Sequence, residues 1–262
     1  MTADPMAGRG PLLSVDGLSK SFAGLKAVDG ISFEIADGSI TGIIGPNGSG
    51  KSTMIDCISG FQRPDAGRVL LDGADITGRP PDTIARAGLI RTFQTVRLYD
   101  DMTIRQNLLQ AARPFQAVGW VADFFRTAAM HRAVEAAEAR AAELIAMIGL
   151  QRYRDAPAAI LSYGQKKLVA LAAALMPRPR LVVLDEPVAG VNPSRIREVE
   201  EVILRLHAAG ESFVIVEHNV EFIMRLCSRV IVFAQGTKMM EGDPAEVQSD
   251  QRVLEAYLGI RP

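Results

Sequence analysis

The sequence predicts an α/β fold with a mainly parallel sheet at its core, on the basis of three features. Continuous apolar runs such as Leu181–Leu184 and Phe213–Val216 are typical of strands that are buried on both faces of a parallel sheet. Segments with helical periodicity alternate with these runs along the chain. A glycine-rich stretch also joins one apolar run, Ile40–Ile44, to a helical segment, as in a strand–loop–helix unit.

Size and composition limit the class of protein. The chain has 262 residues, enough for one large domain or for a core with a small subdomain. A hydrophobic content of 48% and a charged content of 23% are those of a globular protein. The net charge of -1 gives no support for nucleic-acid binding. Cys57 and Cys227 form no metal-binding pattern, and we expect buried thiols in a reducing compartment.

The sequence also predicts that the chain does not cross a membrane. No apolar run approaches the roughly 20 residues that a membrane helix needs. The segment Met1–Pro11 is polar and lacks the apolar core of a signal peptide. We therefore expect a cytosolic protein with at most a peripheral contact to a membrane.

The N-terminal elements are predicted to be short strands and turns. Strands are expected at Leu12–Leu18 and Ile31–Ile35, with a turn at Asp37-Gly38 that leads into the next strand. Another strand, Val69–Leu71, precedes the turn Asp72-Gly73. A short helix is expected at residues 84–87, after two prolines.

The glycine-rich stretch after Ile44 carries the clearest chemical signal. Residues 45–53 fit the pattern G-x-x-x-x-G-K-[ST], in which backbone N–H groups and a helix N-terminus surround phosphate groups. Lys51 is predicted to reach the β- and γ-phosphates, and the Ser52 hydroxyl to bind Mg²⁺. The alternative, an ordinary glycine turn, does not explain why strand, loop, lysine and helix are all in register. The predicted nucleotide-binding residues of this loop are Asn47, Gly48, Ser49, Gly50, Lys51, Ser52 and Thr53.

The middle of the chain changes to a helical pattern. Thr103 is placed to cap a helix through Ala112, and Asp123 to cap a long helix that covers Ala133–Ile148 and stops at Gly149. These helices predict a helical subdomain inserted into the α/β core. Four aromatic residues lie between them and are expected to pack locally, with a partner surface as the alternative. They are Phe115, Trp120, Phe124 and Phe125.

The last third of the chain returns to alternating strands and helices. Residues 161–165 precede a helix with an apolar face, and Asn192-Pro193 is a cap followed by a first-turn proline, which opens a helix that runs to Gly210. A strand is expected at Val230–Phe233. Asp243, Pro244 and Glu246 form the start of another helix, and a last short helix ends near Leu258.

Polar residues follow two of the apolar strands. Asp185 and Glu186 come directly after Leu181–Leu184. Asp185 is therefore predicted to hold Mg²⁺ through water, while Glu186 orients or deprotonates the water that attacks the γ-phosphate. His218 ends a neighbouring strand, where it is placed either to hydrogen-bond the γ-phosphate or to fill a structural role; the spacing alone leaves both open. Phe22 likewise fits stacking on a nucleotide base or packing in the core.

Several motifs in this order resemble the nucleotide-binding domain of ABC transporters. They are the phosphate loop, Gln94, Leu161–Gln165, Leu184–Pro187 and His218, and the resemblance covers nearly the whole chain. It implies a P-loop NTPase fold of the ABC ATPase type, with a mainly parallel sheet core, an N-terminal antiparallel β subdomain and an inserted helical subdomain. It further implies that residues 12–95 and 178–262 form the β and RecA-like core, that residues 96–177 form the helical subdomain, and that residues 1–11 are flexible.

The resemblance also implies roles for single residues. Phe22 takes the base-stacking position, and Gln94 senses Mg²⁺ and contacts the membrane subunit. Together with Ser52 and Asp185, Gln94 belongs to the metal site. Glu186 is the catalytic base and His218 the switch histidine. The implied cofactors are ATP and Mg²⁺.

The signature motif implies a dimer. Ser162, Gly164 and Gln165 would close in trans over the ATP of a second subunit, because a helix N-terminus there presents N–H groups to a γ-phosphate. The implied partners are a second ATPase subunit, identical or related, two membrane-spanning permease subunits and, indirectly, a periplasmic solute-binding protein. The implied location is the cytoplasmic face of a bacterial inner membrane.

The resemblance narrows to the LivG type of ATPase subunit, which serves branched-chain amino-acid importers. The stretches that carry it are Arg91–Gln94, the extended insert after Leu108, Ala189–Pro193 and Gly242–Val247. Relatives of this type also serve uptake of urea, amides or aromatic acids, so the cargo stays open. A second possibility is the ATPase of an exporter or lipid-extraction system, which has the same type of ATP-hydrolysing domain. A third possibility is an ATPase that acts on ribosomes or DNA. Proteins of that last class usually have two ATPase halves or a long coiled coil, and this sequence shows neither.

Two positions depart from the family pattern. Tyr163 replaces the first glycine of the usual Leu-Ser-Gly-Gly-Gln sequence, while Ser162 and Gly164 remain. Asn192 stands where many family members have aspartate. Asn192 keeps the ability to cap a helix but removes a charge from the loop after the base.

Overall fold

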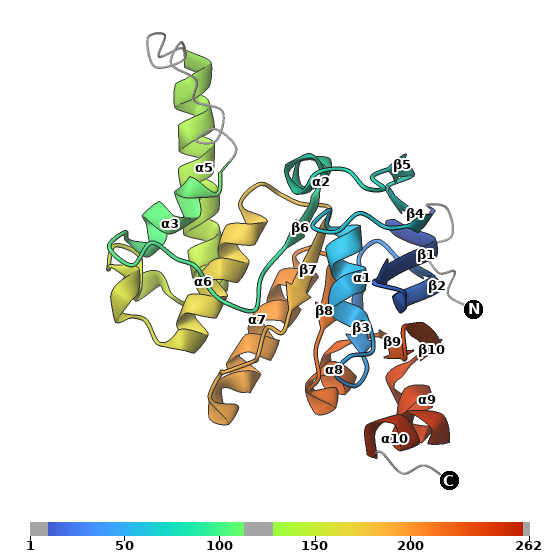
Figure 1. The fold of residues 1–262 in the computed structure, drawn as a ribbon. Helices are drawn as coiled ribbons and strands as arrows, with labels where there is room; N and C mark the ends of the chain where they lie inside the picture. Colours follow the sequence, from blue (N-terminus) through green and yellow to red (C-terminus); the bar gives the residue numbers. More distant parts are fainter. Residues whose placement is uncertain (1–9, 113–127, 259–262) are drawn as a thin grey trace, which may run out of the picture. The chain divides into compact units, whose positions relative to one another are not determined.

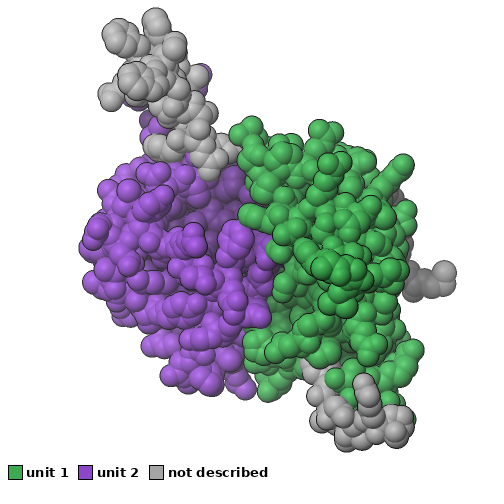
Figure 2. Space-filling view, in the orientation of Figure 1, with its two compact units in different colours: residues 1–89, 211–262 green, residues 90–210 purple. Residues whose placement is uncertain are grey.

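The computed structural model of the protein describes residues 10–112 and 128–258. The chain divides into two compact units, which Figure 2 shows in different colours. Unit 1 comprises residues 1–89 and 211–262, and unit 2 comprises residues 90–210. Asp123 and the four aromatic residues at 115–125 lie outside the described residues.

Unit 1 begins with an antiparallel sheet, as the resemblance implied. Its strands are β1 (Leu13–Phe22), β2 (Leu25–Ile35), β4 (Ala66–Leu71) and β5 (Ala74–Asp75), in the order β2-β1-β4-β5 (Figure 1). The first two strands are longer than the sequence predicted, because they form a hairpin that continues to its tip. Register shifts interrupt their pairing, one of them around Gly17, which has a φ of 59°. Such bulges break the alternation on which the sequence prediction depends.

The second sheet of unit 1 contains the strand that precedes the phosphate loop. The strands of this sheet that belong to unit 1 lie in the order β10-β9-β3-β8, with bounds Thr237–Gly242, Arg229–Ala234, Ile40–Ile44 and Phe213–Val216. β3 pairs in parallel with both β8 and β9, and every residue of β3 and β8 is buried. Continuous apolar runs therefore correctly predicted strands covered on both faces.

The helices of unit 1 are short. They are α1 (Lys51–Ile58), α2 (Pro81–Ala87), α8 (Val220–Leu226), α9 (Pro244–Ser249) and α10 (Gln251–Leu258). The predicted cap of α9 is confirmed, since Asp243 and Glu246 form a capping box. The sequence does not predict α8 or β10. α8 has only seven residues, too few for a clear period, and β10 contains no fully buried residue.

Unit 2 contains two strands and four α-helices among its described residues (Figure 1). The strands are β6 (Leu89–Arg91) and β7 (Leu181–Asp185), and the helices are α3 (Ile104–Gln110), α5 (Ala128–Met147), α6 (Tyr163–Leu175) and α7 (Ile196–Ala208). Short 3-10 turns lie at Gln151–Tyr153, Ala158–Ile160 and Pro193–Arg195. α3 packs against both α5 and α6, so a helical cluster follows β6, as predicted.

Hydrogen bonds at helix starts confirm two predicted caps in unit 2. The Thr103 hydroxyl accepts from the backbone N–H of Gln106 at 3.1 Å, while the Gln106 side chain accepts from the Thr103 N–H at 2.8 Å. At the second cap, Asn192 Oδ1 accepts from the N–H of Ser194 at 3.0 Å and from its hydroxyl at 2.8 Å. The Asn192 cap opens a 3-10 turn that precedes α7.

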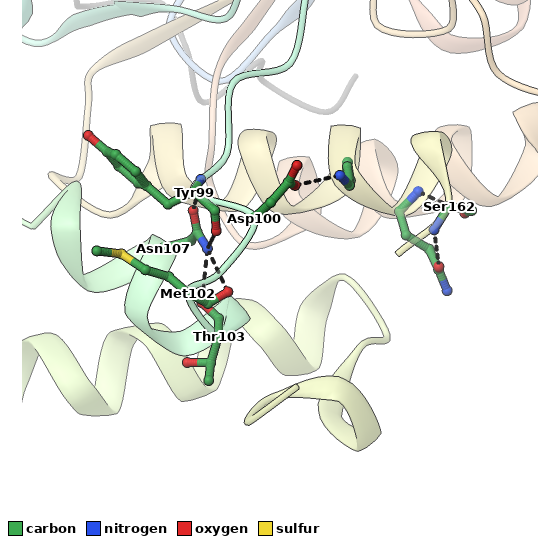
Figure 3. Close-up of polar contacts among 8 residues, drawn as sticks. Tyr99, Asp100, Met102, Thr103, Asn107 and Ser162 are labelled. Carbon is green, nitrogen blue, oxygen red and sulfur yellow. Dashed lines mark hydrogen bonds and ion pairs between the residues drawn. The ribbon is translucent and has the colours of Figure 1, made fainter. Parts of the chain in front are cut away.

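The segment before α3 is held in place by the buried side-chain amide of Asn107. Asn107 is 6% exposed and donates from Nδ2 to the carbonyls of Tyr99, Met102 and Thr103, at 3.0, 3.2 and 3.0 Å (Figure 3). Its Oδ1 accepts from the N–H of Tyr99 at 2.9 Å. A buried side-chain amide with all these partners fixes the loop that connects β6 to the helices.

Two predictions from composition are consistent with the described residues. Within residues 10–112 and 128–258, no helix is both long and apolar enough to span a bilayer. Cys57 and Cys227 are buried free thiols, as predicted. Burial raises the pKa of Cys57 to about 11 and that of Cys227 to about 12.

Candidate functional site

The phosphate loop lies between β3 and α1 in unit 1, and its shape requires glycine. Gly48 and Gly50 have φ angles of 77° and 97°, in the left-handed region that side chains disfavour. A Cβ on Gly50 would lie 2.2 Å from the carbonyl oxygen of Ala27. Gly50 is also the N-cap of α1, and no side chain caps the helix. The first N–H groups of α1 are therefore left for a ligand with oxygen acceptors.

Lys51 bends back across its own loop. Its Nζ donates to the carbonyls of Gly45 and Pro46, at 2.7 and 3.1 Å, and to the Ser49 hydroxyl at 3.4 Å. The ammonium group thus lies over the concavity that the loop encloses. Ser52, in the first turn of α1, is exposed. The loop residues predicted from the sequence therefore lie together, as required for a phosphate site.

Phe22 is at the end of β1, in the hairpin of the antiparallel sheet. Its side chain is 45% exposed, and Lys20 Nζ lies 5.5 Å from the ring centroid. The interpretation of Phe22 as a core residue is wrong, because the ring faces solvent. An exposed aromatic face beside a cation is available for stacking.

His218 follows β8 and has an exposed side chain, at 59%. The turn that carries it is held by Glu217, whose side chain is fully buried and accepts from the N–H groups of His218 and Asn219, at 2.9 and 3.1 Å. His218 Nδ1 lies 3.5 Å from the same carboxylate oxygen. This role of Glu217 was not predicted; its signal in the sequence is a carboxylate between an apolar strand and a histidine.

Asp185 is the last residue of β7 in unit 2, and its carboxylate forms an ion pair. Arg91 Nη2 donates to Asp185 Oδ2 at 2.8 Å, and the two side chains are 8% and 15% exposed. A carboxylate has about four acceptor positions, so this ion pair leaves oxygen lone pairs for a hydrated cation. The resemblance pointed to the stretch around Arg91 but did not identify its pairing with Asp185.

The residues predicted for Mg²⁺ have suitable chemistry. The Asp185 carboxylate, the Gln94 amide and the Ser52 hydroxyl supply oxygen donors, the type that Mg²⁺ prefers. Gln94 and Asp185 belong to unit 2, and Ser52 to unit 1. No cluster of three or more His, Cys, Asp or Glu side chains suited to a metal exists among the described residues.

Glu186 has an unusual backbone. Its φ is 48°, in the left-handed region, which costs of order 1–3 kcal/mol for a residue with a side chain. Its carbonyl accepts from Lys167 Nζ at 2.6 Å and from the N–H of Ala189 at 3.2 Å. The surrounding contacts thus hold Glu186 in a conformation that the isolated chain would rarely adopt.

The signature residues form the first turn of α6. Ser162 is the N-cap, its hydroxyl accepting from the Gln165 N–H at 3.3 Å and its N–H donating to Gln165 Oε1 at 2.9 Å (Figure 3). The helix begins at Tyr163, within the motif, and Ser162 is exposed. Tyr163 donates from its hydroxyl to the carbonyl of Gln94 at 3.3 Å. Ser162, Gly164 and Gln165 therefore lie together, and Tyr163 links the same turn to the backbone of Gln94.

Lys167 is a residue near the proposed site that was not predicted from the sequence. This lysine is buried, 8% exposed, on the second turn of α6, and it reaches the backbone of Glu186. The signal in the sequence was its spacing: Lys167 lies four residues before Leu171, on the apolar face of the helix. A lysine on such a face needs a hydrogen-bond acceptor inside the protein, because burying an ammonium group without one is costly.

The amino-acid sequence matches two family models and is similar to several known proteins. Residues 28–189 match the family model "ABC transporter", and residues 237–261 match "Branched-chain amino acid ATP-binding cassette transporter". The chain is 36% identical over 250 residues to the high-affinity branched-chain amino acid transport ATP-binding protein BraF of Pseudomonas aeruginosa, covering 95% of this chain and 98% of that protein. It is 37% identical to LivG of Escherichia coli strain K12, with the same coverage. A probable LivG of the archaeon Archaeoglobus fulgidus is 38% identical over 252 residues, covering 95% of this chain and 96% of that protein.

Solved structures give the same result for the fold. A crystal structure of an ATP-binding cassette of an ABC transporter, in its ADP conformation, matches with a TM-score of 0.82 and 34% identity. The match covers 96% of this chain and 100% of that one. A nucleotide-free ATP-binding cassette from an ABC transporter matches with a TM-score of 0.81, again at 34% identity, covering 96% and 100% of the two chains. The predicted α/β fold of the ABC ATPase type is therefore confirmed.

Proposed function

This chain belongs to the ABC transporter family as an ATP-binding subunit, and on that premise we propose that it powers an importer of branched-chain amino acids. It is an ATPase whose reaction is ATP + H₂O → ADP + phosphate, coupled to transport. The observation that carries the proposal is the phosphate loop, with its glycine-dependent shape and Lys51 folded over it. The named relatives, similar over 95% of the chain, support the type of transporter.

The nucleotide is held mainly by unit 1 residues. The N–H groups of residues 47–53 donate to phosphate oxygens, and the Lys51 ammonium moves from the loop carbonyls to the β- and γ-phosphates. Phe22 stacks on the base. Ser52, Gln94 and Asp185 would hold Mg²⁺, which would supply positive charge to neutralise the terminal phosphates.

Hydrolysis requires that water be deprotonated at the γ-phosphate. Glu186 accepts a proton from the attacking water, the water oxygen bonds to γ-phosphorus, and the bond to the β–γ bridging oxygen breaks. His218 donates a hydrogen bond to the γ-phosphate, from a side chain that the structure leaves exposed. Gln94 orients the same water.

A second subunit completes the site in this proposal. Ser162, Gly164 and Gln165 close over the ATP of the partner, since the exposed N-terminus of α6 offers N–H groups and a favourable dipole to phosphate. The partner is an identical or related ATPase subunit. Both act on two membrane-spanning permease subunits at the cytoplasmic face of the inner membrane, supplied by a periplasmic solute-binding protein. Residues 12–262 work as one ATPase domain, with residues 96–177 as its helical subdomain.

Branched-chain amino acids are favoured over the other cargoes by the relatives and by the C-terminal match at residues 237–261. Importers of urea, amides or aromatic acids remain the alternative within the same type. Identification of the ligand of the co-purified solute receptor distinguishes them.

Two substitutions test the proposed chemistry in the protein purified with its partner subunits. The Glu186→Gln change removes the base and keeps the size of the side chain, so turnover should fall by at least about 100-fold while MgATP still binds. The Lys51→Ala change should instead weaken nucleotide binding itself. Steady-state phosphate release and equilibrium binding of a fluorescent ATP analogue measure the two effects.

The opposite pattern would contradict the assignment. Unchanged turnover in the Glu186→Gln protein removes that residue from the role of base. Equal affinity in the Lys51→Ala protein removes the loop lysine from the phosphate site.

A further inference from the structure

Lys167 is a buried cation whose partner is the backbone of the proposed base. Its side chain projects from α6, is 8% exposed and donates to the Glu186 carbonyl at 2.6 Å. A hydrogen bond from a charged donor at this distance is among the stronger ones. An ammonium group is costly to bury without such acceptors. The contact joins residues 19 positions apart in the chain.

The carbonyl that Lys167 holds controls the direction of the Glu186 side chain. Glu186 has a φ of 48°, and its carbonyl also closes the turn to Ala189, whose N–H donates to it at 3.2 Å. Releasing the carbonyl allows the backbone of Glu186 to relax toward ordinary φ values. Because Cα carries both groups, that rotation redirects the carboxylate.

Tyr163 braces the same lysine from one turn earlier on α6. Lys167 Nζ lies 5.6 Å from the centroid of the Tyr163 ring, within the range of a cation–π interaction. The ring also packs against Gly190, where a Cβ would lie 3.0 Å from its Cε1 atom. The hydroxyl donates to the carbonyl of Gln94 at 3.3 Å. One side chain therefore contacts the loop of Gln94, the loop after Glu186 and the lysine between them.

We propose that Lys167 is a positioning residue for Glu186, with Tyr163 as its brace. The first two turns of α6 then have two functions. They present Ser162 and Gly164 to the ATP of the partner subunit, and they hold the base in their own chain. This inference rests on the proposed role of Glu186 as the base.

One structural consequence concerns the departure from the common signature sequence. A glycine at position 163 would leave no ring between Gln94, Gly190 and Lys167. Because Tyr163 contacts all three, the position of Glu186 depends on the position of the first turn of α6. Movement of α6 as it closes on a nucleotide is transmitted to Glu186 through Lys167.

The test is a Lys167→Met substitution, which keeps the length of the side chain and removes the charged donor. In the protein with its partner subunits, kcat for ATP hydrolysis should fall about tenfold. The KM for MgATP should stay within about twofold, because Lys167 does not hold the nucleotide. The Lys167→Arg variant restores a cationic donor and should recover at least about half of kcat.

Lys166→Met is the matched control. Lys166 is the neighbouring lysine on α6, and it pairs with Asp100 at the surface, where Asp100 is 59% exposed. Surface pairs of this kind contribute little, so kcat should stay within about twofold. If Lys167→Met fails to fold, Tyr163→Leu tests the same link by removing the ring. It should lower kcat by about threefold to tenfold, whereas Tyr163→Phe keeps the ring and should lose less.

The outcomes separate this inference from the function on which it depends. An inactive Glu186→Gln protein beside a Lys167→Met protein with unchanged kcat overturns the link alone. A Glu186→Gln protein that keeps its turnover overturns the base assignment and the link with it. A lowered kcat that arginine at position 167 does not restore, or that is matched by an equal rise in KM, also counts against the proposal.

Discussion

The phosphate loop in unit 1 and the loop of Glu186 in unit 2 are built in different ways. The phosphate loop is shaped mainly by its own backbone and by Lys51, which donates to carbonyls five and six residues away, and the Gly236 N–H also donates to the Ser49 carbonyl at 3.1 Å. The loop of Glu186 is held by side chains from distant positions. Lys167 is 19 residues from Glu186, and Arg91 is 94 residues from Asp185.

This difference indicates which of the two loops is more sensitive to changes in neighbouring elements. The phosphate loop depends on its own glycines and on two neighbours elsewhere in unit 1, the Ala27 carbonyl that lies against Gly50 and the Gly236 N–H. A loop whose shape comes from α6 and β6 changes when those elements change. The phosphate loop is thus shaped by contacts within unit 1, whereas the loop of Glu186 depends on elements of unit 2.

The largest effect that tests this contrast is expected at Gly50. The Gly50→Ala change places a Cβ 2.2 Å from the Ala27 carbonyl, at a φ of 97°, so the loop must move. We expect nucleotide affinity to fall at least about 100-fold and the free energy of unfolding to fall by about 3 kcal/mol. Isothermal titration with MgATP and urea denaturation measure these changes.

Gly48 provides the control for this prediction. It has a φ of 77°, but a Cβ there meets no atom within 4 Å. The Gly48→Ala change should cost only the conformational strain, about 1 kcal/mol, and should weaken binding less than Gly50→Ala. Equal effects at the two glycines would contradict the steric account of the loop.

The next effect tests the distant support at Asp185. The Arg91→Met change leaves a carboxylate that is 15% exposed without its ion-pair partner. Loss of one partner from a largely buried pair should lower the free energy of unfolding by about 2–3 kcal/mol. Arg86→Met removes a pair between side chains that are 80% and 62% exposed, and should cost less than about 0.5 kcal/mol. Urea denaturation that gives both variants the same stability would rule out a structural role for Arg91.

A smaller effect is expected at Asn192, where the loop after Glu186 has local support of its own. Its side chain accepts from both Ser194 groups at the start of the 3-10 turn. The Asn192→Ala change should cost about 1 kcal/mol, while Asn192→Asp keeps an oxygen acceptor and should cost little. Thermal unfolding compares the two. A loss as large for aspartate as for alanine would show that the cap does not act through its acceptor.

The smallest effect concerns Cys57, which lies in α1 behind the phosphate loop. Burial raises its thiol pKa from 9.0 to about 11, so the folded protein contains about 100-fold less thiolate at pH 8 than the unfolded chain. This contribution to stability is present below pH 9 and is lost as the pH rises toward 11. Alkylation by iodoacetamide at pH 8 should be correspondingly slow in the native protein. Equally fast reaction in native and unfolded protein would show that α1 opens readily.

The sequence predicted what is encoded in contiguous residues. The phosphate loop, the buried strands β3, β7 and β8, and the caps at Thr103, Asn192 and Asp243 each depend on neighbours within a few positions. The family resemblance supplied the order of the motifs and the type of fold. Local patterns were therefore sufficient for most elements of the core.

What the sequence did not predict depends on contacts between distant residues or on very short elements. The hairpin extends β1 and β2 beyond the predicted strands, bulges interrupt their alternating pattern, and α8 is too short for a periodic signal. The exposure of Phe22 became clear only when its strand was seen to continue into the hairpin. The contacts of Arg91 and Lys167 with Asp185 and Glu186 follow from tertiary packing, which no local pattern reports.

The most direct test of the proposed mechanism is the molar mass of the Glu186→Gln protein in the presence of MgATP, measured by light scattering during gel filtration. If one chain supplies the phosphate loop and another supplies Ser162 and Gly164, nucleotide that cannot be cleaved should hold two ATPase subunits together. We predict a species of twice the subunit mass with MgATP and of single mass without it, and no such species when Lys51→Ala is added. A protein that stays at single mass while its unmutated form hydrolyses ATP at full rate would contradict the two-chain site.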